Sequence, residues 1–323
     1  MAKVAGVSVA TVSRVVNGKH WVAPQTRELV EKAIRDTGYT TNHSARTLAT
    51  GRSDSLAFLL TEEHHLLFSD PTFSMLLRGA AEALTKRRMT LVLLVAGTPD
   101  ERAAVHNYVS SGHVDGVMLV SSHESDPLLE SLVEAGVPTV SCGLPLGHQV
   151  EVPSVSVDEA GSASEMTRYL MGQGHRRIAM IAGPQDTPGG RFRLDGFKAA
   201  LGEAFDPRLV VQGDYSVASG EAAMEQLLAQ GQAPDAVFAA SDSMAVGAIR
   251  ALRRAGMAVP EDVAVGGFDD SGLAESHDPP LTTMAQPWSE IAEGMVELLL
   301  SIIDGAAPEQ RTLPTRLVVR SSA

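Results

Sequence analysis

The chain has 323 residues, of which 44% are hydrophobic and 20% charged, so it can bury a large core and is not globally disordered. Only 4% of the residues are aromatic, which favours a parallel α/β architecture over an all-β sandwich. A single cysteine excludes internal disulfides and multi-cysteine metal sites. No apolar run reaches about 18 residues or forms a signal-peptide core, so we expect a cytoplasmic protein. The length of the chain suggests two or three domains.

The net charge of −13 is unevenly distributed along the chain. Residues 1–53 hold eight basic and three acidic side chains, a net charge of +5, so residues 54–323 carry −18. A small basic segment suits a polyanion, because contacts with phosphates release counterions. An ordinary solvated helical surface gives the same charge, so charge alone leaves both interpretations open.

Three segments at the amino end are predicted to be helical. Met1–Ala5 is short, ends at Gly6 and is expected to be a truncated first helix. Ser8–Val16 begins at a serine N-cap and repeats valine at helical spacing. Pro24–Thr37 has proline at its first position and ends at Gly38. A tight turn between the first two segments is typical of a helix-turn-helix.

Residues 54–323 alternate short apolar strands with longer helical patterns, which predicts βαβ units and parallel sheets. The number of strands exceeds one doubly wound domain, so we expect two similar lobes with a ligand cleft at the carboxyl ends of their strands. The predicted strands are Leu56–Leu60, Leu91–Val95, Gly116–Val120, Thr139–Cys142, Ser154–Val157, Ile178–Ala182, Ala236–Ala239 and Val263–Gly267.

The segment AGVSVATVSRVVNG (Ala5–Gly18) carries the strongest functional signal. If the amino end of its helix enters the major groove, Val9 and Ala10 face base edges. Arg14, one turn later, can bridge guanine O6 and N7. The short polar side chains suited to phosphate oxygens are Ser8, Thr11, Ser13 and Asn17. A surface helix with an ordinary N-cap is the alternative.

Motifs along essentially the whole chain resemble the LacI/GalR family of bacterial repressors. In chain order they are AGVSVATVSRVVNG, TRELVEKAIRDTGY (Thr26–Tyr39), NHSARTLATGRSDSLAFLL (Asn42–Leu60), HVDGVMLV (His113–Val120), GHRRIAMIAG (Gly174–Gly183), RFRLDGFKAAL (Arg191–Leu201), PEDVAVGGFDDS (Pro260–Ser271) and PPLTTMAQP (Pro279–Pro287). The resemblance implies a helix-turn-helix head, a hinge helix and a core of two doubly wound parallel-sheet lobes, like periplasmic sugar-binding proteins. It also implies a homodimer that reads a palindromic operator.

On this resemblance we divide the chain into three parts. The head spans 1–41, the hinge helix and linker 42–53, and the effector-binding and dimerisation core 54–323. The amino-terminal lobe is expected at about 54–153 plus 286–311, and the carboxyl-terminal lobe at about 154–285 plus 312–323.

The hinge gives a mechanical expectation. In the family, a leucine at the position of Leu48 wedges into the minor groove at the operator centre, and such wedges kink DNA. Asn42, Ala45 and Arg46 also match the family pattern. A helix this short is not stable alone, so its order should depend on DNA and on a partner hinge.

The resemblance also implies an effector site in the core. Arg193 and Asp269 match residues that contact the family's ligands, and a guanidinium and a carboxylate suit sugar hydroxyls. Tyr215 and Trp288 match aromatic positions near the ligand, with core packing as the alternative for each. Further candidates are Ser69, Asp70, Phe73, Ser121 and Ser241. Asp242 is expected to cap the helix that follows it rather than to bind the effector, which we expect to be a sugar or oligosaccharide.

Catalysis, cofactors and metals find little support. The sequence has no Gly-x-Ser-x-Gly elbow and no P-loop. Glu62–Glu63 and His64–His65 resemble a metal cluster superficially, but adjacent residues point apart, so a solvated loop is expected.

Two other functions compete with a regulator. A solute-binding receptor with a degraded, weak DNA-binding head would need a signal peptide. A carbohydrate-active enzyme using Asp269–Asp270 would lack facing carboxylates. We therefore predict a ligand-responsive DNA-binding repressor of carbohydrate uptake or catabolism genes, and not an enzyme.

Overall fold

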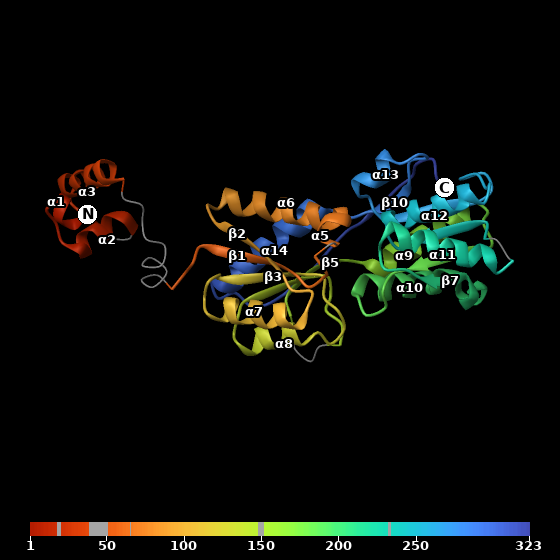
Figure 1. Ribbon diagram of the computed structural model, residues 1–323, viewed down its shortest axis with the longest axis horizontal. Coiled ribbons are helices and arrows are strands. Elements are labelled where there is room, and N and C mark those ends of the chain that lie inside the picture. Colours follow the sequence, from red (N-terminus) through yellow and green to blue (C-terminus); the bar gives the residue numbers. More distant parts are fainter. Residues whose placement is uncertain (18–20, 39–50, 65, 148–151, 232–233) are drawn as a thin grey trace. The chain divides into compact units, whose positions relative to one another are not determined.

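The computed structural model of the protein describes residues 1–17, 21–38, 51–64, 66–147, 152–231 and 234–323. The chain divides into two compact units, Met1–Ser53 and Asp54–Ala323, and each is described by itself (Figure 1). None of the helices in the described ranges is long and apolar enough to cross a membrane.

The described residues of the first unit form three helices, at the places predicted from the sequence. They are α1 (Ala2–Ala5), α2 (Val9–Asn17) and α3 (Pro24–Thr37). Ser8 caps α2, since its hydroxyl accepts a hydrogen bond from the Thr11 backbone N–H at 3.1 Å. Ala23 precedes α3 without a side-chain cap, and Gly38 ends α3 in the left-handed conformation that glycine adopts without a steric cost. The buried side chains of this small core are Ala5, Val12, Val15, Val30 and Ala33.

The first lobe of the second unit is a six-stranded, wholly parallel sheet in the order β11-β5-β4-β3-β1-β2. Its strands are β1 (Ser55–Leu60), β2 (Thr90–Val95), β3 (Gly116–Val120), β4 (Thr139–Cys142), β5 (Ser154–Val157) and β11 (Gln310–Leu313). Its helices are α5 (Leu66–Ser69), α6 (Pro71–Lys86), α7 (Pro99–Ser110), α8 (Pro127–Glu134) and α14 (Trp288–Ile303). Apolar side chains of α6 and α14 cover one face, and those of α7 and α8 the other (Figure 1).

The second lobe repeats this plan in the order β12-β10-β9-β8-β6-β7, and β12 is antiparallel to β10. Its strands are β6 (Ile178–Ala182), β7 (Val210–Gln212), β8 (Ala236–Ala239), β9 (Ala264–Asp269), β10 (Thr282–Ala285) and β12 (Arg316–Val318). Its α-helices are α9 (Glu159–Gly172), α10 (Pro188–Leu201), α11 (Val217–Ala229), α12 (Asp242–Arg254) and α13 (Gly272–Ser276). The predicted fold class is confirmed: a helical head comes first in the chain, and a core of two doubly wound lobes follows it in the sequence.

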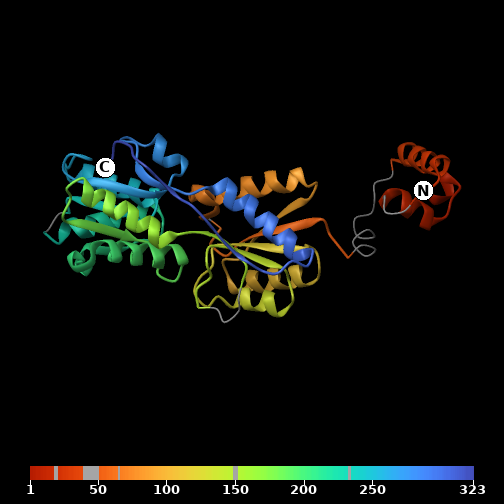
Figure 2. The ribbon, with the colours of Figure 1, turned by 180° about the vertical axis from the view of Figure 1, so that it is seen from behind.

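The lobe boundaries differ from the expected ones at two of the three crossings. β5 pairs with β4 and β11, so the chain leaves the first lobe after Val157 and not before Ser154. β11 runs to Leu313, beyond the expected crossing at 311–312. The alternation of strands and helices along the chain predicts where a strand lies, but it does not say which of the two sheets that strand joins. The predicted lobe boundaries are therefore shifted by a few residues. The segments that connect the lobes, near residues 158, 286–287 and 314–315, are seen from behind in Figure 2.

Candidate functional site

A cavity of about 330 Å³ lies between the two lobes of the core. Its walls come from segments that follow the carboxyl ends of β1, β3, β6 and β9, the usual ligand position in doubly wound folds. Its volume lies within the range of about 300–1,000 Å³ seen for small-molecule sites. Seven of the predicted effector residues line it: Asp70, Phe73, Ser121, Arg193, Tyr215, Asp269 and Trp288.

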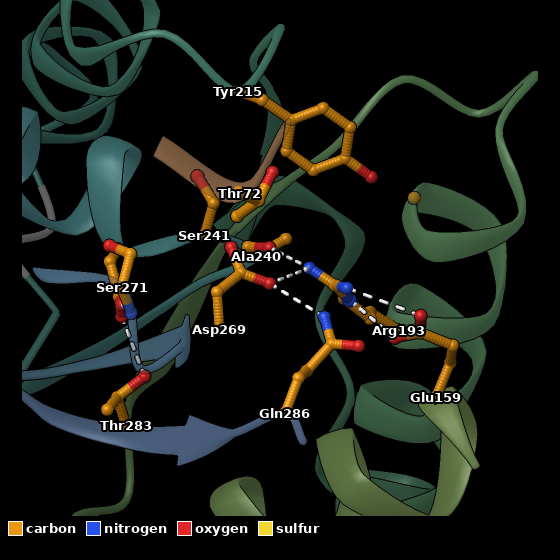
Figure 3. Close-up of polar contacts among 12 residues, drawn as sticks. Thr72, Glu159, Arg193, Tyr215, Ala240, Ser241, Asp269, Ser271, Thr283 and Gln286 are labelled. Atoms are coloured by element: carbon orange, nitrogen blue, oxygen red, sulfur yellow. Dashed lines mark hydrogen bonds and ion pairs between the residues drawn. The ribbon is translucent and has the colours of Figure 1, made fainter. Parts of the chain in front are cut away.

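Arg193 of α10 is the centre of a buried network in the second lobe (Figure 3). Its Nε donates to Glu159 at 2.6 Å, and its Nη1 donates to the carbonyl oxygen of Ala240 at 2.6 Å. The same Nη1 lies 3.4 Å from Oδ1 of Asp269, and the guanidinium stacks 3.7 Å from the centre of the Phe268 ring. Burial opposes the charge, but the carboxylates of Glu159 and Asp269 outweigh it and raise the pKa of Arg193 above its ordinary value. The guanidinium is therefore a charged group held in one orientation.

Asp269 joins this network to the segment that leads back to the first lobe. Its Oδ1 accepts a hydrogen bond from Nε2 of Gln286 at 2.9 Å, and its carbonyl oxygen accepts one from Nε1 of Trp288 at 2.9 Å. Burial raises the pKa of Asp269 well above its usual range, although Arg193 partly counters this. Trp288 packs with the core of the first lobe and also lines the cavity, so the core packing is observed and a contact with an effector stays a prediction.

Tyr215 lines the cavity in an unusual backbone conformation, with φ of 70°. Its hydroxyl lies 3.3 Å from Oγ1 of Thr187, and burial raises its pKa to about 12. The ring lies against Gly183, where an added Cβ would come within 2.4 Å of the ring carbon Cζ. Glycine at 183 is therefore what allows the aromatic ring to occupy this place.

Two of the predicted polar residues of the first-lobe wall, Asp70 and Ser121, lie at a helix cap and in a turn. Asp70 caps α6, because its Oδ1 accepts from both the backbone N–H and the hydroxyl of Thr72, at 2.9 and 2.7 Å. Burial raises the pKa of Asp70 despite these bonds. Ser121 follows β3 and donates its hydroxyl hydrogen to the carboxylate of Glu62.

Two predicted effector residues, Ser69 and Ser241, do not line the cavity. Ser69 is exposed at the end of α5. Ser241 is buried and caps α12, because its hydroxyl accepts from the Met244 backbone N–H at 3.2 Å. The expectation that Asp242 is this cap is wrong: its carboxylate accepts from the Ser271 backbone N–H at 2.7 Å and from the Thr283 hydroxyl at 2.6 Å.

The polar residues that line the cavity and that sequence reasoning missed include Glu62, His123, Glu159 and Gln286. Glu62 was assigned to a solvated loop, yet it contacts Ser121 and His123, while His64 pairs with Glu101 at 2.8 Å. Their position in the sequence could have identified two of the missed residues. Glu62 and His123 follow the carboxyl ends of β1 and β3 by two and three residues, where ligands usually bind in doubly wound folds. No metal-binding group of histidine, cysteine and acidic residues occurs among the described residues.

The head presents the predicted DNA-binding face of α2 to solvent. Val9 is 76% exposed, and Ser8, Ala10, Ser13 and Arg14 are exposed as well, whereas Val12 and Val15 face the core. Thr11 is half-buried, and Asn17 is the last residue of α2. The hinge residues Asn42, Ala45, Arg46 and Leu48 lie outside the described residues.

Known proteins resemble this chain from end to end. Residues 1–42 match the model for bacterial regulatory proteins of the lacI family, and residues 167–323 match a periplasmic binding protein-like domain. The chain is 44% identical to the HTH-type transcriptional regulator CelR of Thermobifida fusca, covering 100% of this chain and 96% of CelR. It is 34% identical to the HTH-type transcriptional repressor CytR of Escherichia coli (strain K12), covering 98% and 93%.

Solved structures agree with this similarity. A complex of the transcriptional regulator CelR with cellobiose has a TM-score of 0.81 and 43% identity, and the match covers 100% of this chain and 98% of that one. The lac repressor dimer bound to operator and the anti-inducer ONPF has a TM-score of 0.87 and 29% identity, covering 99% and 97%.

Proposed function

Because this chain belongs to the LacI family of bacterial regulatory proteins, we propose that it is a transcriptional repressor that binds a palindromic operator as a homodimer. In this proposal a sugar bound between the lobes sets the affinity for the operator. The observation that carries the proposal is that one chain combines an exposed recognition face on α2 with a cavity that both lobes line and into which each lobe brings polar side chains. Such a regulator acts in the bacterial cytoplasm.

Several features of the cavity support a sugar as the effector. The fixed guanidinium of Arg193 and the carboxylates beside it offer directional donors and acceptors for hydroxyl groups. Phe73 and Trp288 offer aromatic surface for the apolar face of a sugar ring. CelR forms a complex with cellobiose, so cellobiose is the first sugar to test.

The charge of the cavity favours a neutral sugar over a sugar phosphate. Acidic residues outnumber basic ones in its lining, and Arg193 is already paired with two carboxylates. A phosphate would have to displace these partners or lie beside them, and like charges brought together in a buried site repel.

An enzymatic role finds no support in the acid pair that the sequence offered. Asp269 is held by Arg193 and Gln286, whereas Asp270 pairs with Arg320 at 2.7 Å. The two neighbouring carboxylates thus have separate partners, and glycoside hydrolysis needs carboxylates that face each other across a substrate. The family is one of transcriptional regulators and not of enzymes.

The test is fluorescence anisotropy on the DNA upstream of the gene, with and without cellobiose and a panel of other sugars. We expect tight binding to one palindromic site and a change of about 5- to 150-fold in affinity with the effector. Arg14→Ala should lose about 1–3 kcal/mol on that site and much less on random DNA, because its contact is to base edges. Sugar binding without specific DNA binding would favour the receptor-like alternative instead.

A further inference from the structure

Side chains hold the two lobes together at a place separate from the connecting segments. His123 and Glu124 follow β3 in the first lobe, and they meet Asp186 and Arg191 at the start of α10 in the second. The Nδ1 atom of His123 lies 2.8 Å from Oδ2 of Asp186. The guanidinium of Arg191 donates to both carboxylate oxygens of Glu124, at 2.9 and 2.6 Å. The Glu124 backbone N–H donates to the carbonyl oxygen of Asp186 at 2.6 Å. We call these four residues the latch.

His123 also connects the latch to the cavity. Its second ring nitrogen, Nε2, lies 3.0 Å from Oε1 of Glu62, and Glu62 lines the cavity and accepts the Ser121 hydroxyl. A carboxylate only accepts hydrogen bonds, so an imidazole that bonds a carboxylate at each nitrogen needs a proton on both. The two contacts therefore select the imidazolium cation.

We propose that His123 is a positioning residue: its imidazolium holds the second lobe against the cavity wall through Asp186, and loss of one proton opens the lobes. The two carboxylates on the ring are Glu62 and Asp186, and the other charged members of the latch are Glu124 and Arg191, which neutralise each other. Neutral His123 keeps at most one donor, so one of its two carboxylate contacts fails. If the failing contact is the one to Asp186, the Arg191–Glu124 pair remains between the lobes. This ion pair is half-exposed, so it contributes little to the free energy of closure on its own.

The direction of the pH dependence follows from the partners. Hydrogen bonding to Glu62 raises the pKa of His123 to about 9, against the effect of burial and with further help from Asp186. In opened lobes the contact with Asp186 is lost, whereas Glu62 belongs to the same lobe as His123 and stays beside it, so the pKa of His123 falls only part of the way toward its ordinary value of about 6.5. The contribution of His123 to closure is therefore fully present below the pKa of the open form, and it disappears as the pH rises through about 9.

The experiment measures the distance between the lobes in sugar-free protein. Spin labels are attached to Ala103→Cys on α7 and Ala199→Cys on α10, both exposed positions, with labelled protein diluted into unlabelled protein. The native Cys142 is partly exposed and lines the cavity, so all labelled proteins also carry Cys142→Ala. Between pH 7 and pH 9.5 we expect the ratio of closed to open protein to fall about 3- to 10-fold, a range reduced for the partial exposure of the latch.

Two variants and one control make the test specific. His123→Gln and Asp186→Ala should each show the open distance at pH 7 and little change with pH. His64→Gln removes a histidine–carboxylate pair that lies within the first lobe, so it should behave like the parent protein. Equal distances at pH 7 and pH 9.5 in the parent, or a pH change that survives in both variants, would overturn the proposal.

The consequence for the effector rests on the proposed function and is tested separately. If sugar binds the closed lobes, the affinity for cellobiose should fall several-fold over the same pH range, and this fall should vanish in His123→Gln. A sugar panel without any binding would contradict the proposed function and leave the label distances unaffected, so the two failures are distinguishable.

Discussion

The two walls of the cavity are built differently. In the second lobe, the buried Arg193 and Asp269 and the half-buried Glu159 form a network that holds the guanidinium in one orientation. In the first lobe, Asp70, Ser121 and His123 lie in turns and a helix cap; Asp70 contacts Thr72, Ser121 contacts Glu62, and His123 contacts both Glu62 and Asp186 of the opposite lobe. The second-lobe wall is thus organised before a ligand arrives, while one contact of the first-lobe wall, that of His123 with Asp186, depends on closure. We expect the second-lobe wall to determine the affinity for the effector, and the first-lobe wall to determine how strongly the lobes close when the effector binds.

The largest effect should come from Arg193→Ala. This change leaves the half-buried Glu159 and the buried Asp269 without their cation, which costs about 3–5 kcal/mol of core stability. Cellobiose affinity should fall more than about 100-fold, as expected for the loss of several charge-assisted hydrogen bonds. Thermal unfolding and calorimetric titration measure both quantities.

Arg208→Ala is the matched control, because this arginine pairs with Asp206 on the surface of the same lobe. It should leave the effector affinity as it is. Undiminished cellobiose affinity in Arg193→Ala would mean that the second-lobe wall is not the fixed part of the site, and the contrast between the walls would fail.

An intermediate effect is expected for Gly183→Ala. The new Cβ would overlap the ring of Tyr215, so the tyrosine must leave its place, at a cost of about 1–3 kcal/mol. We expect a 10- to 100-fold loss of effector affinity in the same titration. Gly172→Ala, at the end of α9 with no atom close to the added Cβ, should be neutral or slightly stabilising. An equal effect of both alanines would show that the position of Tyr215 does not matter.

The smallest effect should come from Asp70 in the first-lobe wall. Asp70→Ala removes the cap of α6 and should cost about 0.5–2 kcal/mol in chemical unfolding. Asp70→Ser keeps a capping hydroxyl, so its stability should stay close to that of the parent. If both variants lose effector affinity equally, the carboxylate contacts the ligand; if only Asp70→Ala does, the cap is what matters.

The sequence predicted local features of this protein well. Ser8 and Gly38 bound their helices as expected, because capping depends on neighbours a few residues away. All eight predicted strands form, with end shifts of at most two residues. The strands that were missed, β7, β10, β11 and β12, have three or four residues each, and so short a segment carries little pattern, although β4, β5 and β8 were found with four residues.

Residues brought together by the fold were harder to predict. Arg193 and Asp269 were found through family motifs, and the cavity includes both. Glu62, His123 and Asp186 belong to loops of three different strands, and nothing in their spacing along the chain says that these loops meet. The cap of α12 was assigned to Asp242 and is Ser241, because either side chain is a good cap and only the backbone conformation decides.

The order of the strands has a consequence for synthesis. The strands β1–β5 of the first lobe are complete at Val157, but α14, which covers one face of their sheet, begins only at Trp288. A ribosome adding about 5–20 residues per second needs on the order of 10 s to make the residues between them. During that time the apolar face of the nascent sheet lacks half of its cover, while the second lobe is made in almost one piece. The lobe that leaves the ribosome first thus waits for α14 and β11 until most of the second lobe has been made, and we expect it to be the part of the chain with most need of a chaperone.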